Sequence, residues 1–177
     1  MALWSGWQLS RERHRRASRY LEVLTHAPDQ ASLRWLIGHA PTPETALQEL
    51  DLARRAIALM VAEHDALDDR TVADVTHELN AILAAQGDDG AVSNRLWTER
   101  LQAYTAAMAR RGTGDLPRAR VARVLLAACS LPDPSPEVLE QGAELVAYYR
   151  QASNDALRAA FGDARLPENI RPSAFKD

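Results

Sequence analysis

Few residues in this sequence combine the types and spacing that catalysis or metal binding requires. His77 and Glu78 begin like the His-Glu-x-x-His motif of zinc proteases, in which two histidines four residues apart bind the metal. The second histidine position is Ala81, so this motif lacks a ligand. Cys129 is the only thiol, and it follows an apolar run near a predicted helix C-terminus, where the helix dipole disfavours a thiolate. We therefore expect Cys129 to be a core residue, and we predict no catalytic residue, metal site or cofactor.

Acidic side chains gather in the connection around residues 63–69. Glu63, Asp65, Asp68 and Asp69 have the oxygen ligands that divalent cations prefer, with His64 among them. No glycine stands where a calcium-binding loop needs its sharp turn. This composition is typical of a solvated turn that caps the next helix, and we interpret it so.

A glycine-rich break between two basic segments is the strongest candidate for anion binding. Residues 112–114 read Gly-Thr-Gly, and the backbone N–H groups of such a break can bind phosphate at the start of the next helix. The alternative is an ordinary loop whose arginines pair with carboxylates elsewhere in the fold. The candidate anion-binding residues are Arg110, Arg111, Arg118 and Arg120.

The two ends of the chain carry candidate contact residues for a macromolecular partner. Tryptophan and arginine are enriched among the residues that dominate binding energy at protein interfaces. Two indoles precede a cluster of arginines at the N-terminus, and spaced apolar residues follow the last predicted helix. The tryptophans have two alternatives, folding back onto the bundle or contact with a membrane surface. The candidate interaction residues are Trp4, Trp7, Arg11, Arg13, Arg15, Arg16 and Phe175.

The elements that must position these residues are helices. Alanine, leucine, arginine and glutamate form helices well, whereas the β-branched and aromatic residues of strands are sparse and never alternate over a strand's length. Proline, glycine and short polar residues divide the chain, and we predict an all-α bundle of about six to seven helices with extended N- and C-terminal segments. The predicted helices cover 11–25, about 29–40, 43–64, 69–85, 93–111, 115–131 and 136–161.

Length and composition set the class of protein. The 177 residues include 46% apolar residues and one cysteine, which predicts a single helical domain with an apolar segment at 1–9 and an extended tail at 163–177. No apolar run reaches the roughly 18 residues that span a bilayer, so we expect a cytoplasmic protein. Twenty of the 21 basic residues are arginine, a bias associated with GC-rich bacterial genomes.

The net charge of -3 hides alternating blocks. Residues 1–27 carry a net charge of +3 and residues 28–90 carry -8, whereas 91–123 carry +5 and 124–177 carry -3. The small total argues against a uniformly basic protein that coats nucleic acid. The blocks either neutralise each other within one bundle or pair with the opposite blocks of a partner or a second copy.

We therefore expect a non-enzymatic helical interaction module that is a subunit or assembly factor of a bacterial multiprotein complex. We expect it to bind a protein partner or to form a homo-oligomer. The alternative is a small subunit that contacts a nucleic-acid backbone through arginine patches. An enzyme would need a pocket that joins His77 and Glu78 to an arginine of another helix.

Overall fold

Seven α-helices make up the regular structure in the described part of the chain, so the all-α prediction is confirmed. The computed structural model describes the backbone of residues 2–65, 69–85, 90–109 and 114–162. It describes the side chains of these ranges apart from 2–10, 23–25, 69–70, 83–85 and 90–93. The helices are α1 (Ala2–Thr25), α2 (Gln30–Ile37), α3 (Pro43–Asp65), α4 (Asp69–Ala85), α5 (Gly90–Ala109), α6 (Pro117–Ala128) and α7 (Pro136–Phe161).

Short polar side chains cap the N-termini of three helices, α2, α3 and α7. Asp29, Thr42 and Ser135 each accept a hydrogen bond from a backbone N–H in the first turn of the helix that follows. Such bonds satisfy donors that have no partner within the helix. At the other end of the last helix, Gly162 adopts a φ of 88°, which favours glycine, and α7 ends there as expected.

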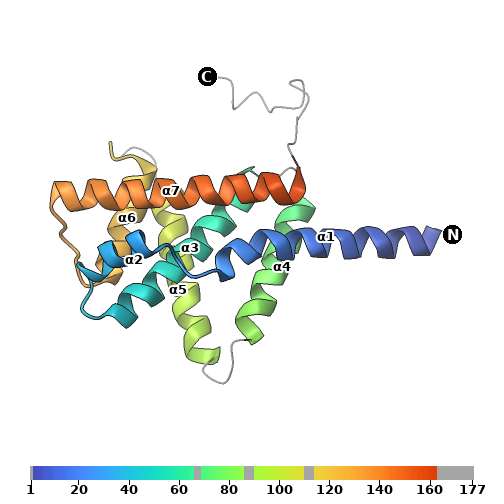
Figure 1. Ribbon diagram of the computed structural model, residues 1–177, viewed down its shortest axis with the longest axis horizontal. Helices are drawn as coiled ribbons and strands as arrows, with labels where there is room; N and C mark the ends of the chain where they lie inside the picture. The colour runs from blue at the N-terminus through green and yellow to red at the C-terminus, as the bar shows by residue number, and fades with distance from the viewer. Residues whose placement is uncertain (1, 66–68, 86–89, 110–113, 163–177) are drawn as a thin grey trace.

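The N-terminal segment differs from the prediction. Residues 2–9 are part of α1, so the helix begins at Ala2 instead of the predicted Arg11. The segment contains no proline, and Gly6 costs a helix only about 1 kcal/mol relative to alanine, so nothing in it stops the helix. The first turns of α1 extend past the other helices (Figure 1). The predicted extended tail at 163–177 lies outside the described residues.

Other boundaries also differ: α2 ends at Ile37 and α6 at Ala128, each about three residues before the predicted end. Helix α5 begins at Gly90, three residues before the predicted start, and its last described residue is Ala109. Helix α6 begins at Pro117 instead of the predicted Asp115, and Leu116 takes the extended conformation of its cap. Proline is well suited to a first helical position, because its fixed φ matches the helix and its missing N–H leaves no donor unpaired.

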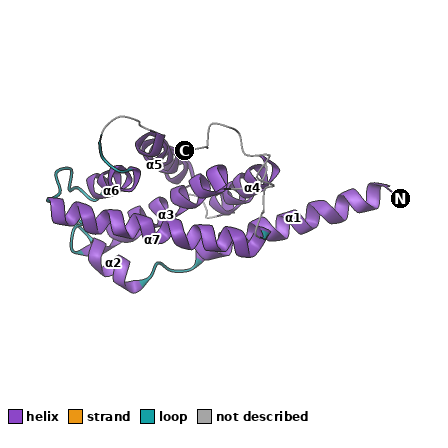
Figure 2. Cartoon of the chain, turned by 90° about the horizontal axis from the view of Figure 1, so that it is seen from above, coloured by secondary structure: helices purple, strands orange, loops and turns teal. Residues whose placement is uncertain are grey.

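Helix α3 is the centre of the bundle, and it contacts all six other helices. Thirteen of its residues are buried, several of them alanines that allow neighbouring helices to approach closely. Helices α1 and α7 lie side by side and antiparallel across it, and α4 packs on the other flank of α1 (Figures 1 and 2). This arrangement brings the arginines of α1 beside the C-terminal end of α7.

Helices α6 and α7 make the most extensive contact between two helices in the described part of the chain, and Gly142 lies within it. A Cβ atom at this position would lie 3.2 Å from the Cβ of Ala122 and 3.4 Å from both Leu126 Cδ1 and Trp35 Cη2. The absence of a side chain at Gly142 thus lets α2 and α6 pack directly on the α7 backbone.

We predict that Gly142→Leu destabilises the protein by about 1–3 kcal/mol, because the added side chain must displace three packed neighbours. Urea unfolding followed by circular dichroism measures the change. The matched control is Ala159→Leu, at an exposed position of the same helix, which we expect to change the unfolding free energy by about 0.5 kcal/mol or less. Equal stability of the two variants would contradict this account of the packing.

Candidate functional site

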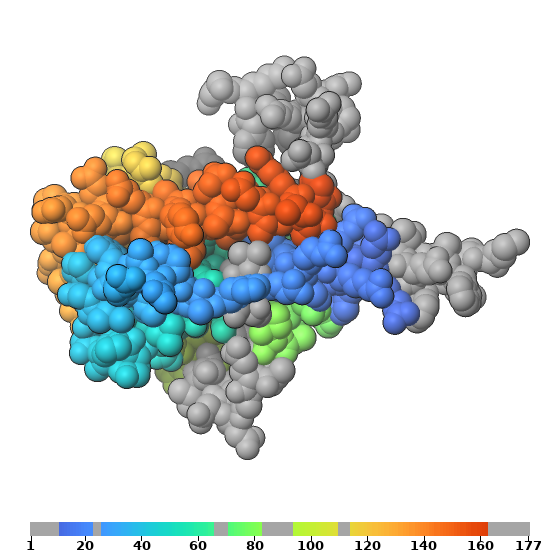
Figure 3. All heavy atoms as spheres, in the orientation of Figure 1, coloured from blue at the N-terminus to red at the C-terminus, as the bar shows by residue number. Residues whose placement is uncertain are grey.

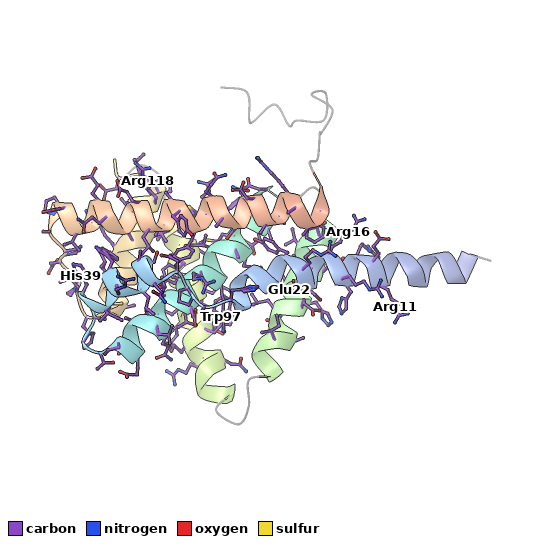
Figure 4. The ribbon with its side chains drawn as sticks, viewed as in Figure 1. Arg11, Arg16, Glu22, His39, Trp97 and Arg118 are labelled. Atoms are coloured by element: carbon purple, nitrogen blue, oxygen red, sulfur yellow. The ribbon has the colours of Figure 1, made fainter. Side chains whose placement is uncertain are left out.

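A groove of about 740 Å³ lies between α1 and the C-terminal end of α7. Figure 4 shows Arg11 and Arg16 on the part of α1 that borders it. The groove is lined by Arg11, Glu12, Arg15, Arg16, Arg19, Ala160, Phe161 and Gly162. Four guanidinium groups and one carboxylate therefore surround a single hollow.

Helical spacing places the arginines on one face of α1. Arg11, Arg15 and Arg19 follow one another at intervals of four residues, so they form a row along the helix. The opposite face carries Ala17, Tyr20 and Leu21, all at most 1% exposed. Burial of the apolar face in the bundle therefore forces the arginine row outward, toward the groove.

The arginines of the groove differ in their partners. Arg16 Nη2 lies 2.7 Å from Glu12 Oε1, an exposed pair one turn apart. Arg15 and Arg19 have neither a hydrogen bond nor an ion pair with any residue that the structure describes. Two guanidinium groups of the groove are thus available to an external anion.

Helix α4 holds α1 in position through polar contacts. Ser18 Oγ donates to Glu78 Oε1 at 2.9 Å, and His14 Nε2 lies 3.3 Å from Glu78 Oε2. Arg13 Nε lies 3.9 Å from Asp74 Oδ2, which is a weak ion pair. Arg13, one of the predicted interaction residues, therefore faces α4 and does not line the groove.

The second half of α1 is tied to the core. The Tyr20 hydroxyl donates to the Ala58 carbonyl oxygen of α3 at 2.8 Å. Burial raises the pKa of Tyr20 well above its usual value, and the negative charge of Asp65 raises it further. Tyr20 stays protonated at neutral pH and keeps this hydrogen bond, which fixes α1 on α3 directly behind the arginine row.

A buried arginine fixes the junction between α1 and α2. Arg54 of α3 is 6% exposed, and its Nη2 donates to the His26 carbonyl oxygen at 2.9 Å. Its guanidinium also lies 5.5 Å from the centre of the Tyr149 ring on α7 and 3.2 Å from Asp51 Oδ1. The Tyr149 hydroxyl donates to Asp29, which caps α2, at 3.0 Å. Arg54 therefore joins α3 to α7 and to the residue that follows α1, and Tyr149 extends this connection to the cap of α2.

The second predicted arginine patch has a different role where the structure describes it. Arg120 donates from Nε to the Ala107 carbonyl oxygen at 2.7 Å and from Nη2 to that of Met108 at 3.3 Å, and it also bonds the Asp115 carbonyl. It thus satisfies carbonyl groups at the end of α5. Arg118 is exposed at the far end of the molecule from Arg11 and Arg16 (Figure 4). Arg110 and Arg111 lie outside the described residues, so anion binding by this patch stays a prediction.

The side chains of three predicted interaction residues lie outside the described part of the structure. Trp4 and Trp7 belong to the first turns of α1, but their side chains lie outside the described part of the structure. Phe175 lies in the undescribed range 163–177. Contacts by these three residues stay predictions.

His77 and Glu78, the residues considered for catalysis, lie at the contact between α4 and α1. His77 is exposed, and its ring lies 5.6 Å from that of His14, while Glu78 accepts the hydrogen bond that joins α1 to α4. Within the described ranges, no three His, Cys, Asp or Glu side chains gather as metal ligands would. In those same ranges no helix is both long enough and apolar enough to cross a membrane.

Sequence reasoning missed a buried ion pair between α3 and α5. Glu49 accepts from Arg100 Nε and Nη2, both at 2.7 Å, and Glu49 is 4% exposed. These hydrogen bonds raise the pKa of Arg100 above its usual value. The position of Glu49 between the buried residues Ala46, Leu50 and Ala53 was a signal, because it places a carboxylate on the apolar face of its helix.

Comparisons with known proteins identify no relative. No family model, no curated protein and no solved structure matches this chain.

We predict that Arg100→Leu destabilises the protein by about 3–5 kcal/mol, because it leaves the buried Glu49 carboxylate without its partner. The double variant Glu49→Leu/Arg100→Leu should recover most of this loss, since it removes both charges from the core. Denaturant unfolding measures both changes. Arg95→Leu, which breaks an exposed pair with Glu99 on the same helix, is the control and should cost about 0.5 kcal/mol or less. A single variant as stable as the control would contradict the role of the buried pair.

We also predict that Cys129 is inert in the folded protein. Burial raises the pKa of its thiol to about 11, with the charge of Glu49 as a second cause, so about one thiol in a thousand is ionised at pH 8. Iodoacetamide at pH 8, followed by mass spectrometry, should label Cys129 only after denaturant is added. Rapid labelling of the native protein would show that the thiol is accessible and ionised.

Proposed function

We propose that this protein is a helical interaction module that binds an acidic segment of a protein partner in the groove between α1 and α7. The observation that carries the proposal is the row of arginines along the groove, in which Arg15 and Arg19 have no partner among the described residues. The protein acts by binding, as a subunit or assembly factor. From the arginine-rich composition and the lack of a long apolar run, we also propose a bacterial, cytoplasmic setting.

The shape and lining of the groove favour a polypeptide ligand. Carboxylate side chains match the guanidinium group in a bidentate geometry, and Arg15 and Arg19 have donors for two such pairs. Phe161 adds an aromatic, half-buried wall, which suits the apolar side chains that separate carboxylates in a peptide. Arginine and aromatic residues together are typical of the centre of protein interfaces.

A nucleic-acid ligand fits the surface less well. A strand that followed the groove would not reach Arg118, the exposed residue of the second predicted patch, which lies at the other end of the molecule from Arg11 and Arg16 (Figure 4). Binding to a phosphate backbone is therefore the competing outcome of the test below.

We predict that a fluorescent glutamate-rich peptide binds the protein and that Arg15→Glu/Arg19→Glu weakens this binding tenfold or more, a loss of about 1.4 kcal/mol or more. Fluorescence anisotropy at about 0.1 M and about 1 M salt measures the affinity and its screening. The matched control is Arg95→Glu/Arg118→Glu, which changes the net charge equally at exposed positions away from the groove and should leave the affinity within about twofold.

The same titrations with single- and double-stranded DNA distinguish the two ligand classes. We expect DNA to bind more weakly than the peptide. Tighter binding of DNA that is lost in Arg15→Glu/Arg19→Glu would replace the proposal with the nucleic-acid alternative. Equal peptide affinity of the groove variant and the control variant would overturn the assignment of the groove.

A further inference from the structure

The first half of α7 carries an acidic face. Glu137, Glu140 and Glu144 are exposed and lie on one side of the helix, because they are three and four residues apart. None of them has a hydrogen bond or ion pair with a residue that the structure describes. Tyr148 continues the same face one turn later and is 54% exposed, one of the largest apolar exposures in the described chain. We call Glu137, Glu140, Glu144 and Tyr148 the acidic face.

The acidic face and the arginine groove lie at opposite ends of the molecule. Figure 3 shows the orange atoms of the first half of α7 at one end and, at the other, the dark-blue atoms of α1 against the red end of α7. Gly162 of the groove is 18 residues beyond Glu144, which on one straight helix is about 27 Å. Arg15 and Arg19 therefore cannot be neutralised by the three glutamates of the acidic face within one chain.

The two surfaces match in charge and spacing. The groove row of Arg11, Arg15 and Arg19 spans eight residues, about 12 Å along α1, and Glu137 to Glu144 span seven, about 10.5 Å along α7. Two helices laid side by side can therefore bring successive carboxylates to successive guanidinium groups.

We infer that the groove of one copy binds the acidic face of α7 from a second copy, so that the acidic partner of the proposed function is this chain itself. Glu140 and Glu144 pair with Arg15 and Arg19, and Tyr148 packs toward the Phe161 wall. The inference rests on the proposed function and names its partner. Each copy offers one groove and one acidic face, so the contact forms twice in a two-fold dimer or repeats from copy to copy.

Electrostatics favours this occupant. Both surfaces are present at the same concentration whenever the chain is present, and pairing them removes like-charge repulsion within each row. The net charge of -3 is small, so two copies repel each other weakly outside the contact. A contact of this type is screened by salt, which gives the association a clear signature.

Two charge-reversed variants test the inference. Arg15→Glu/Arg19→Glu makes the groove acidic, and Glu140→Arg/Glu144→Arg makes the acidic face basic. Sedimentation velocity of the full chain at about 0.1 M salt measures the mass. We expect the wild type to have at least twice the 19.6 kDa mass of one chain and to dissociate at about 1 M salt, and each variant alone to sediment as a 19.6 kDa monomer. A mixture of the two variants should regain the mass of the assembly. The acidic groove of one variant can bind the basic face of the other, and the unchanged groove and unchanged acidic face can still pair with each other.

The controls separate this inference from the proposed function. Arg95→Glu/Arg118→Glu should keep the wild-type mass, and circular dichroism should show unchanged helicity in every variant. A wild type that is monomeric at about 0.1 M salt overturns the inference, and if it still binds the glutamate-rich peptide, the proposed function survives. An assembly that persists in both single-surface variants, or a mixture that does not reassemble, also overturns the inference. A monomer that binds the peptide more tightly after removal of residues 163–177 would point to the chain's own tail as the occupant and would overturn it as well.

Discussion

The buried guanidinium of Arg54 is the interaction on which the placement of the surface helices depends. A charge this far from water is costly unless its donors are used, and here they are taken by the Asp51 carboxylate and the His26 carbonyl, with the Tyr149 ring against the guanidinium. Tyr149 in turn donates to Asp29 at the start of α2. Partial burial raises the pKa of Asp29, but hydrogen bonds from Ser32, Tyr149 and Ala31 outweigh it, so this carboxyl ionises below its usual pKa and accepts all of them. These contacts hold the junction after α1 against α3 and α7, where α1 lies antiparallel to α7.

This placement of the helices determines which charges of the alternating blocks pair within the chain and which lie on its surface. Part of the charge is neutralised inside the bundle, as in the pair between Glu49 and Arg100. Part of it has no partner among the described residues, namely Arg15 and Arg19 in the groove at one end of the molecule and the three glutamates on one face of α7 at the other. A net charge near zero is thus compatible with a strongly polarised surface, and such a surface favours oriented contacts over non-specific ones.

The sequence predicts the parts of this structure that local chemistry controls. The caps at Asp29, Thr42 and Ser135 and the stop at Gly162 concern neighbours in the chain, and the helices begin or end there. The extent of α1 was wrong because no local signal marks its start, and its helical turns run on to Ala2. The arginine cluster was predicted as a contact surface, but the groove was not, since it requires Phe161 to lie beside residues about 140 positions earlier. The roles of Glu49 and Arg54 also depend on distant partners: the place of Glu49 on the apolar face of its helix indicates burial, but nothing nearby in the sequence identifies Arg100 as its partner.

The most direct test of the central claim, that the arginines of the groove bind carboxylates, is an NMR titration of the arginine Nε–H resonances with the glutamate-rich peptide. Hydrogen bonds to carboxylates move these resonances, and each arginine is assigned by single Arg→Lys substitution. The account predicts that the signals of Arg15 and Arg19 shift with increasing peptide while those of Arg95 and Arg118 do not. Shifts confined to Arg95 and Arg118, or no shift at any arginine, would contradict it.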